Sequence, residues 1–561
     1  MMQTSRRSLL FAVAWFLATG LSQPLSPQSA PQQVSITLLG TTDIHGNLFP
    51  VDYYQNRPAN RGLAKVATLI KQARATDKNV LLLDSGDTIQ GTPLAYYFAR
   101  VDTSKPNPTI AAMNALHYDA MAVGNHEFNF GLPNLMRAKR EAGFPMLGAN
   151  ILSDASPTAT EYFRPYIIKE IGGVKVGIVG FVTPGIPRWE VPAHYKGYTF
   201  EQIVAAAQRV IPEVRQRADL VVVIAHSGLE REAPNDRPFP QEIAGENAIY
   251  ALAEQVPGID VILFGHTHQE VAEKIVNGVL LAQAKNWGQS LARAEVVLEK
   301  KAGEWKIVSK NSTVIPVTDA VEPDPEILEL ARPYHEATQV SLDAPVAECG
   351  VDLEGSRARY EDHPFVDLIH KVQMEYGKAD ISFATLFLPT ARIPAGKVSV
   401  RQIASLYIYE NTLYTIELTG AEVRAAIEHS ASLFTSWPLK EGERPRQPGY
   451  NADIAEGVEY QVDLTQPAGN RVKNIRYKGK PLDPAAKFRV AVNNYRYSGG
   501  GRYTMFQKKP ILYASPQELR ELMIEYVRRT GVLPTQANNN WRIVPKEAVD
   551  AMVQDAMLPA R

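Results

Sequence analysis

Five short polar clusters, each placed directly after an apolar run, constrain the fold of this chain more than any other feature. The apolar runs have the composition of buried strands, and segments with helical spacing lie between most of them. This alternation predicts an α/β domain built on a mixed sheet, in which ligands bind beyond the carboxyl ends of the strands. We therefore expect the clusters to converge on one place: Thr42-Asp43-Ile44-His45-Gly46, Ser85-Gly86-Asp87, Gly124-Asn125-His126-Glu127-Phe128-Asn129, Ala225-His226-Ser227-Gly228 and Gly265-His266-Thr267-His268.

The residue types in these clusters are those of a site for two metal ions. Two ions about 3.5 to 4 Å apart require a ligand that can bridge them, with oxygen or imidazole donors around each ion. Asp87 is the natural bridge, and an asparagine carbonyl such as that of Asn125 is an uncommon ligand whose place beside His126 is informative. Any one cluster alone is explained as well by a turn or a core histidine. Their joint occurrence at five strand ends favours a dinuclear phosphoesterase site.

Composition narrows the range of substrates. The chain has 561 residues, a formal net charge of -1 and a pI of about 6.9, so it has no excess of basic residues for holding a nucleic-acid polymer. A small or mononucleotide substrate fits better, and we expect a monomer. Cys349 is the only cysteine, which excludes an intrachain disulfide.

The N-terminus has the layout of an export signal. Arg6 and Arg7 precede a short apolar run from Leu9 to Leu17, and a Pro/Ser/Gln-rich spacer follows to about residue 33. The run is too short for a transmembrane anchor, and no cysteine follows it that could carry a lipid. The twin arginines are compatible with Tat export as well as with Sec export. We expect a periplasmic or secreted protein.

Patterning beyond the signal divides the chain into domains. We expect a catalytic domain over 34–322 and a linker helix over 323–345, which starts at Glu322-Pro323-Asp324-Pro325 and allows one domain to move against the other. A second domain of α+β character is expected over 346–540, where tyrosines and arginines are frequent, and a tail over 541–561.

The order and spacing of the clusters resemble those of calcineurin-like metallophosphoesterases. Over roughly residues 34 to 540 the chain resembles the bacterial 5'-nucleotidase and 2',3'-cyclic-nucleotide 2'-phosphodiesterase/3'-nucleotidase family. The resemblance implies a four-layer α/β metallophosphoesterase sandwich, a C-terminal substrate-binding domain and two divalent ions, which the donor types allow to be Zn, Mn, Co or Fe. It also implies the ligand sets, namely Asp43, His45, Asp87 and His268 for one ion and Asp87, Asn125, His226 and His266 for the other.

The same resemblance implies roles for residues outside the ligand sets. His126 would stabilise the transition state or protonate the leaving oxygen, and Asn129 stands where 5'-nucleotidases usually have an aspartate that orients this histidine. In the C-terminal domain, Leu388 to Gly396 resembles a phosphate-contacting segment, and the segments Tyr407 to Asn411 and Asn493 to Gly501 resemble those that sandwich a base. The implied substrate-binding residues are Arg392, Tyr409, Asn411 and Tyr495, whereas we expect Tyr407 and Tyr497 to be core residues.

Differences between branches of the family bear on the substrate. Asn129 and the run Asp52-Tyr53-Tyr54 resemble the cyclic phosphodiesterase/3'-nucleotidase branch, which favours hydrolysis of 2',3'-cyclic nucleotides to 3'-nucleotides and then to nucleoside and phosphate. A neutral Asn129 is expected to leave the pKa of His126 lower than a carboxylate would. The alternatives are a 5'-nucleotidase or nucleotide-sugar hydrolase on the same site, and a non-catalytic surface nucleotide-binding protein. The intact ligand set disfavours the last alternative.

Overall fold

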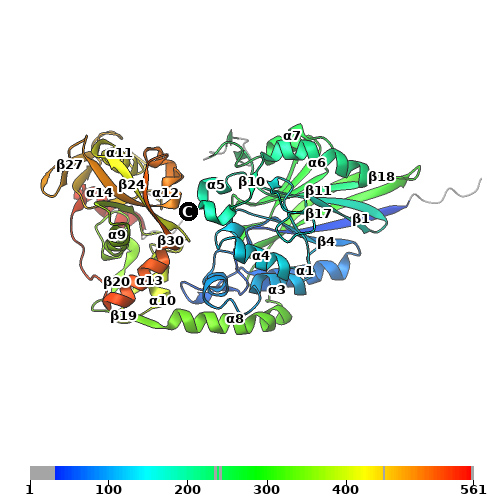
Figure 1. The fold of residues 1–561 in the computed structure, drawn as a ribbon, viewed down its shortest axis with the longest axis horizontal. Helices are drawn as coiled ribbons and strands as arrows, with labels where there is room; N and C mark the ends of the chain where they lie inside the picture. The colour runs from blue at the N-terminus through cyan, green and yellow to red at the C-terminus, as the bar shows by residue number, and fades with distance from the viewer. Residues whose placement is uncertain (1–31, 233–236, 239–242, 446–448, 557–561) are drawn as a thin grey trace, which may run out of the picture.

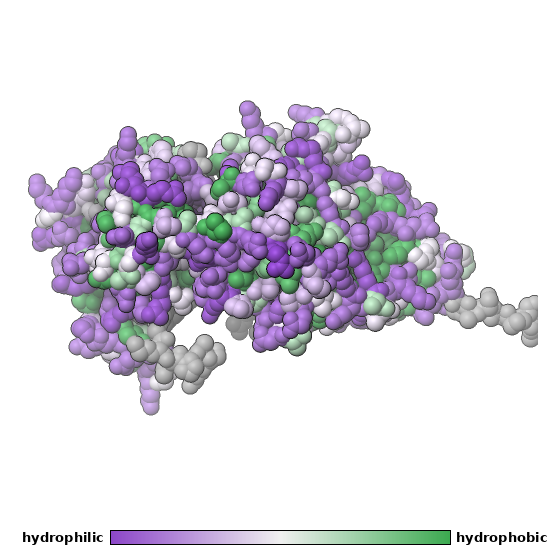
Figure 2. Space-filling model, turned by 90° about the horizontal axis from the view of Figure 1, so that it is seen from below, coloured by the Kyte–Doolittle hydropathy of each residue, from purple (hydrophilic) through white to green (hydrophobic). Residues whose placement is uncertain are grey.

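A computed structural model describes residues 32–232, 237–238, 243–445 and 449–556. The expected export signal lies outside these residues. Figure 1 shows two lobes joined by the long helix α8 (Pro325–Asp343), which runs along one side of the molecule. The surface seen in Figure 2 is mainly hydrophilic, with hydrophobic residues interspersed among charged ones. Within the described residues, no helix combines the length and the apolar character needed to cross a bilayer.

The N-terminal lobe contains two six-stranded sheets that pack face to face. One has the order β18 (Glu304–Pro316), β17 (Ser290–Lys301), β1 (Gln33–Thr41), β4 (Val80–Asp84), β5 (Ala120–Ala122) and β6 (Met146–Leu147). The other has the order β15 (Val271–Val276), β16 (Val279–Gln283), β14 (Val261–Phe264), β11 (Leu220–His226), β9 (Val174–Val182) and β8 (Tyr166–Ile171). The β8–β9 hairpin confirms the predicted mixed sheet.

Alternation along the strands explains this layering. In β11, Val222 and Ile224 belong to the apolar cluster between the sheets, whereas Val221 and Val223 belong to the cluster beneath helices α6 (Ile203–Arg217) and α7 (Ile249–Gln255). Successive side chains of a strand point to opposite faces, so a strand that is apolar throughout must be covered on both sides. Helices α1 (Leu63–Thr76), α3 (Pro108–Ala115) and α4 (Leu132–Glu141) cover the other sheet. The predicted four-layer α/β sandwich is confirmed.

Two long strands close this lobe. Strands β17 and β18 span 12 and 13 residues and pair antiparallel along almost their whole length. They share a turn at Ala302-Gly303, both with positive φ. The long hairpin extends the first sheet beyond β1.

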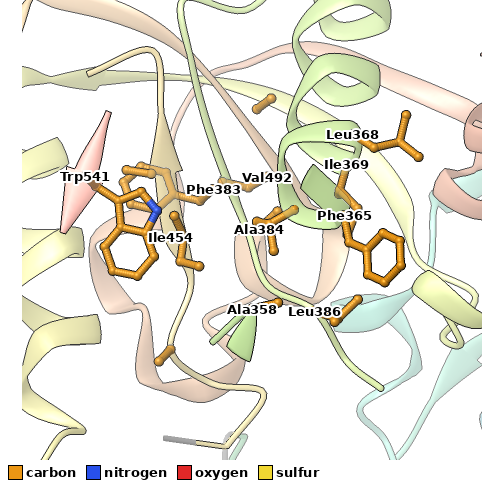
Figure 3. Packing of buried hydrophobic residues seen from close by; sticks show 14 of the residues in the cluster. Ala358, Phe365, Leu368, Ile369, Phe383, Ala384, Leu386, Ile454, Val492 and Trp541 are labelled. Carbon is orange, nitrogen blue, oxygen red and sulfur yellow. The ribbon is translucent and has the colours of Figure 1, made fainter. Parts of the chain in front are cut away.

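The C-terminal lobe is α+β, as predicted. Its five-stranded sheet has the order β25 (Ile454–Glu456), β21 (Ile381–Ala384), β29 (Lys487–Asn493), β24 (Thr412–Thr419) and β30 (Ile511–Glu518). Figure 3 shows Phe365, Leu368 and Ile369 of helix α9 (Pro364–Gly377) beside Phe383 and Ala384 of β21, all in one apolar core. The remaining helices are α10 (Val400–Leu406), α11 (Gly420–Ser432), α12 (Asn494–Tyr497), α13 (Leu519–Thr530) and α14 (Lys546–Ala556).

Residues 541–556 are not the tail that the sequence suggested. Trp541–Val544 forms β31, which pairs parallel with β26 (Glu459–Asp463) in a second, four-stranded sheet that also contains β27 (Val472–Tyr477) and β28 (Lys480–Pro481). Helix α14 buries Ala548, Val549 and Met552 in the core of the lobe. The short strand follows a polar stretch, Gln536-Ala537-Asn538-Asn539-Asn540, and its pairing partner lies about 80 residues earlier, so local sequence gave no sign of it.

Candidate metal centre and substrate pocket

The five polar clusters converge at the carboxyl ends of the central strands. Strands β1, β4 and β5 of one sheet end just before three clusters, and β11 and β14 of the other sheet lead into the remaining two. Six of their side chains form two groups in which potential ligand atoms all lie within 4.8 Å of one another. The first group is Asp43, His45 and His268, and the second is Asp87, His226 and His266.

Asp87 lies between the two groups. Its Oδ2 is 2.8 Å from Nε2 of His226 in the second group and 3.9 Å from Nε2 of His45 in the first. In the first group, the Nε2 atoms of His45 and His268 are 3.0 Å apart. Carboxylate and imidazole groups this close together are the arrangement expected when their lone pairs bind a cation.

Unsatisfied polar atoms within the described residues support this reading. Oδ1 of Asn125 and Nε2 of His226 are buried and make no hydrogen bond. Nδ1 of His45 lies 3.1 Å from the carbonyl oxygen of Gln90, and Nδ1 of His226 lies 2.9 Å from that of Ser85. Because a carbonyl only accepts, Nδ1 carries the proton in both rings and Nε2 keeps a lone pair for a metal.

The donor set of carboxylate, amide oxygen and imidazole fits divalent ions, and the chain binds two of them. These donor types suit Zn, Mn, Co and Fe alike. His266 offers Nδ1, because its Nε2 lies 3.3 Å from Oε1 of Glu246. Its backbone N–H also donates to the carboxylate of Asp43, which ties the His266 loop to the first group.

Five of these ligand candidates have left-handed backbone conformations. Non-glycine residues with positive φ cost of the order of 1 kcal/mol or more each and persist where the surrounding structure enforces them. The strain is therefore concentrated at the site. The five residues are Asp43 (φ 50°), His45 (φ 48°), Asp87 (φ 58°), His266 (φ 80°) and His268 (φ 55°).

Glu127 fastens two of the loops together. Its buried carboxylate accepts hydrogen bonds from the backbone N–H groups of Gly124 (2.6 Å), Asp87 (2.9 Å) and Thr88 (2.6 Å). A Cβ at Gly124 would overlap the side chain and backbone of Asp87. The close approach of these two loops brings Asn125 and Asp87 to the same place.

Burial and neighbouring charge set the protonation of the site. Burial alone would raise the pKa of Asp87, but the imidazoles of His226 and His126 hold it well below its ordinary value. Burial lowers the pKa of His45 to about 4, against the attraction of Asp87. Both groups thus have the ionisation state that a metal ligand requires.

His126 faces the pocket beside these groups. Its side chain is 39% exposed, its Nδ1 is hydrogen-bonded to Oδ1 of Asn129, and its backbone N–H donates to Asp87. Burial would lower the pKa of His126, but Asp87, Asn129 and Glu190 together raise it above its ordinary value. The prediction that Asn129 leaves this pKa lower than a directly bonded carboxylate would stays a prediction. Glu190 supplies part of the charge that raises the pKa of His126 here.

One pocket joins the metal groups to the C-terminal lobe. Its cavity has a volume of about 730 Å³ and is lined by His45, Asn125, His126, His266 and His268 from one lobe. From the other lobe it is lined by Tyr409, Asn411, Tyr450, Asn494 and Tyr495. An elongated substrate can therefore contact both lobes at once.

Aromatic residues form the C-terminal side of this pocket. Tyr409 is 44% exposed, and its ring packs at right angles to Phe387 at a centroid distance of 4.8 Å. The ring of Tyr495 lies over Gly500, where any Cβ would collide with it. Tyr407 is buried in the core, and Tyr497 packs partly buried against that core, as the sequence suggested.

Arg392 differs from its expected place. It lies on β22 (Arg392–Ile393), where its guanidinium pairs with Glu354, and its side chain is 74% exposed. It is not among the residues that line the pocket. The pairing of β22 with β20 (Leu353–Glu354) holds this arginine outside the cavity in the present arrangement of the lobes.

Several residues at the site had no motif in the sequence. Trp189 and Glu190 lie in a proline-containing segment between a predicted strand and a predicted helix, where no periodicity marked them. Tyr450 adds a third aromatic ring, 6.1 Å from that of Tyr409. Glu410 lies inside the predicted base-binding segment Tyr407 to Asn411, but its contact with Gln90 of the other lobe follows only from the docking of the lobes.

Comparison with known proteins agrees with this arrangement. Residues 36–270 match the model of the calcineurin-like phosphoesterase family, and residues 342–508 match that of the 5'-nucleotidase C-terminal domain. The chain is 32% identical to a 2',3'-cyclic-nucleotide 2'-phosphodiesterase/3'-nucleotidase of Haemophilus influenzae, with 91% of this chain and 88% of that protein aligned.

Two further relatives support the same assignment. The trifunctional nucleotide phosphoesterase protein YfkN of Bacillus subtilis is 31% identical over 95% of this chain, which spans 40% of that longer protein. The crystal structure of a 5'-nucleotidase precursor from Thermus thermophilus superposes with a TM-score of 0.63 at 26% identity, over 91% of this chain and 99% of that one. The chain therefore belongs to the bacterial family of 5'-nucleotidases and 2',3'-cyclic-nucleotide 2'-phosphodiesterases/3'-nucleotidases, hydrolases in which a calcineurin-like phosphoesterase domain precedes a 5'-nucleotidase C-terminal domain.

Proposed function

We propose that this chain hydrolyses 2',3'-cyclic nucleotides to 3'-nucleotides and then releases nucleoside and phosphate. The observation that carries the proposal is the one pocket that is lined by histidines of both metal-ligand groups and by Tyr409 and Tyr495. Phosphate chemistry at one end and a stacking surface at the other suit a nucleotide. A hydrolase of small phosphate esters would have no use for the second end.

The proposed metal ligands are those of the two loop sets. Asp43, His45, Asp87 and His268 hold one ion, and Asp87, Asn125, His226 and His266 hold the other; this is supported by the distances around Asp87 and by the unpaired donor atoms of Asn125 and His226. When bound, two such ions activate water and neutralise phosphate charge.

The chain's own residues position the nucleotide and manage the proton. His126, held by Asn129, presents Nε2 to the leaving ester oxygen and gives it a proton as the P–O bond breaks. Tyr409 and Tyr495 bind the base, and Asn411, whose Nδ2 lies 3.3 Å from Oη of Tyr407, lies at the edge of the same surface. Arg392 has no part in this arrangement.

The preference for cyclic substrates rests on the branch features. Asn129 and Asp52-Tyr53-Tyr54 are those of the cyclic branch, and the Haemophilus influenzae relative bears that name. The alternative is a 5'-nucleotidase, which the name of the Thermus thermophilus relative favours. We also infer export to the periplasm or the medium from the N-terminal signal pattern, and a monomeric state.

A hydrolysis panel tests the substrate class. With saturating Mn²⁺, kcat/KM on 2',3'-cyclic AMP should exceed that on 5'-AMP, and chelation should abolish both activities. Asp87→Asn should do the same while the circular dichroism spectrum stays unchanged. A panel in which 5'-AMP is the better substrate transfers the assignment to the 5'-nucleotidase branch.

Substitution of the stacking residues tests the role of the C-terminal lobe. Tyr409→Ala and Tyr495→Ala should each remove about 1 to 3 kcal/mol of base stacking, which raises KM for a nucleotide about 5- to 150-fold. Turnover of p-nitrophenyl phosphate, which has no base, should be nearly unaffected. Equal losses on both substrates would mean that these tyrosines support the fold.

A further inference from the structure

A chain of polar contacts runs away from the pocket behind His126. Nδ1 of His126 contacts Oδ1 of Asn129, and Nδ2 of Asn129 donates to Oε1 of Glu190. The second oxygen of Glu190, Oε2, lies 2.7 Å from Nδ1 of His194. The contacts of His126 with Asn129 and of Glu190 with His194 are local, whereas the contact of Asn129 with Glu190 joins two loops that lie 61 residues apart in the sequence.

This chain of contacts fixes a proton position. A carboxylate only accepts, so the amide nitrogen of Asn129 must face Glu190 and the amide oxygen must face His126. An amide oxygen also only accepts, so Nδ1 of His126 must carry a proton. Nε2 is then the ring atom that faces the pocket. Without Glu190, the amide of Asn129 could rotate by 180° at little cost, and the protonated nitrogen of His126 would no longer be fixed as Nδ1.

Glu190 is well placed to act in this way. Its side chain is 7% exposed, and its two carboxylate oxygens contact Asn129 and His194. The residue ends the short helix α5 (Ile186–Trp189), where its backbone N–H donates to the carbonyl of Ile186 at 2.9 Å. The buried carboxylate thus sits on a fixed turn, one amide away from the imidazole.

The C-terminal lobe holds the segment that carries Glu190. Nδ2 of Asn494 donates to the carbonyl oxygen of Trp189 at 3.0 Å, and the guanidinium of Arg188 donates to that of Ser498. Asn494 and Ser498 flank Tyr495. The position of Glu190 therefore depends on the same short segment that supplies the proposed base-stacking residue.

We propose that Glu190 is a positioning residue for proton transfer by His126, and that it supplies through Asn129 the negative charge that a directly bonded aspartate would supply. The inference rests on the proposed function of His126. In the step concerned, His126 starts as the imidazolium, with a proton on each ring nitrogen. The oxygen of water bonds to phosphorus, the bond from phosphorus to the leaving oxygen breaks, and that oxygen takes the proton from Nε2 of His126, which leaves the neutral ring with its proton on Nδ1. The proton of the attacking water passes to solvent. Glu190 and Asn129 keep the Nδ1–H bond throughout.

Glu190→Gln is the variant that tests this role. It keeps the size of the side chain but removes the charge, and its amide can meet Asn129 in either orientation. We expect kcat on 3'-AMP, whose alkoxide leaving group needs a proton, to fall about 10- to 100-fold. This is less than the roughly 10²- to 10⁴-fold that a general acid contributes, because Glu190 acts only through His126. On p-nitrophenyl phosphate, whose leaving group is stable without a proton, kcat should fall less than about 3-fold. KM should change little on either substrate.

Rescue distinguishes positioning from a structural role. In a Glu190→Gln background, Asn129→Asp places a carboxylate directly on Nδ1 of His126 and should restore most of the lost kcat on 3'-AMP. A Glu190 that only supports the loop would not be replaced in this way. Absence of rescue, or equal losses on both substrates, would overturn the proposal.

A spectroscopic readout is independent of turnover. In the full chain loaded with diamagnetic Zn²⁺, ¹⁵N-histidine spectra should show His126, assigned by comparison with His126→Gln, with its proton on Nδ1. Glu190→Gln should populate the Nε2–H tautomer, and an unchanged tautomer would overturn the proposal. If the wild-type protein failed to hydrolyse nucleotides, the proposed function would fall, while the tautomer and the contacts that set it would still be measured.

Discussion

Gly124 is the residue on which the approach of two metal loops depends. Its backbone N–H donates to Glu127, and its missing side chain leaves the space that the carboxylate and backbone of Asp87 occupy. Any Cβ must push apart the loops that carry Asn125 and Asp87. A glycine chosen for space, and not for a positive φ, is therefore part of the metal site.

Gly124→Ala should weaken metal binding and turnover. The added Cβ would lie 2.2 Å from Oδ1 of Asp87, so Asp87 must move, and this acts on both metal groups. Loss of such supporting contacts costs about 10- to 100-fold in metal affinity or activity. Metal content by mass spectrometry after dialysis and kcat/KM on a nucleotide measure the effect. Gly350→Ala, where a Cβ meets only one distant methyl group, is the matched control and should behave as wild type.

His370 gives the C-terminal lobe a dependence on pH. It is buried with Nδ1 against Oγ of Ser382 (2.9 Å), and burial lowers its pKa to about 3 from an ordinary value of 6.5. Below pH 6.5, His370 is therefore protonated in the unfolded chain but stays neutral in the folded state until the pH approaches 3. The stabilisation is complete above pH 6.5 and is lost as pH falls toward 3, by up to about 1.4 kcal/mol per unit.

His370→Gln should remove this part of the pH dependence. Urea unfolding at pH 7, 5.5 and 4 gives the free energy of unfolding, and the difference between wild type and variant should shrink or reverse toward low pH. Val340→Ala on the exposed face of α8, which removes no titratable group, serves as the control and should leave the slope unchanged. If the free energy of unfolding of His370→Gln changed with pH as steeply as that of the wild type, another group would be responsible for the pH dependence.

At the level of elements, helix α14 packs on the lobe it closes through apolar contacts, and its Asp555 also pairs with Arg444. Ala548, Val549 and Met552 enter the core that also contains Trp541 of β31. The helix begins just after β31 ends at Val544, so the two elements pack as one unit. A chain that stopped at residue 540 would expose the edge of β26 and part of this core.

Met552→Ala should lower the free energy of unfolding by about 2 to 5 kcal/mol, because it leaves a cavity in a packed core. Thermal and urea unfolding measure the loss. Val340→Ala on the exposed face of α8 is the control, and its effect should stay within about 0.5 kcal/mol. If the two variants were equally stable, packing of α14 would not stabilise the lobe, and residues 541–561 would behave as the tail that the sequence predicted.

At the level of the whole molecule, the two lobes meet through a buried polar interface. Arg520 of α13 contacts Glu410 (3.1 Å) and Glu518 (3.2 Å) of its own lobe and Oη of Tyr54 (2.6 Å) of the catalytic lobe. Tyr96 of the catalytic lobe also contacts Glu521. Interfaces of this polar kind permit relative motion of domains more readily than apolar ones. The substrate pocket lies along the same boundary, so motion of the lobes changes its shape.

A crosslink across this boundary should slow the turnover of nucleotides. In Tyr96→Cys with Glu521→Cys, a short bis-maleimide would join the lobes, and the buried Cys349 would not compete. A nucleoside held by one lobe and a phosphate held by the other must both leave, so we expect kcat on nucleotides to fall at least about 10-fold. Each single-cysteine variant treated with the same reagent is the control. Unchanged turnover would show that the lobes need not move.

The sequence by itself predicted the mixed sheet of the catalytic domain and the convergence of its five polar clusters, and the family resemblance added the four layers and the proposed ligand sets. Strands that are apolar throughout, such as β11, must be covered on both faces, and a polar cluster after such a strand must lie at its carboxyl end. Those two local rules bring Asp43, Asp87, Asn125, His226 and His266 to one edge of the sheets without reference to any distant residue.

Only the tertiary structure decided which side chains stand behind and opposite those ligands. Glu190 approaches Asn129, Tyr450 approaches Tyr409, and Arg392 turns toward Glu354, through the docking of loops and lobes that no periodicity records. The pairing of β31 with β26 is equally remote in sequence. Local patterns fix what is buried and on which face, because burial repeats with the period of the element. Contacts between separate elements depend on the whole packing, and they decide here how His126 is held and what shape the pocket has.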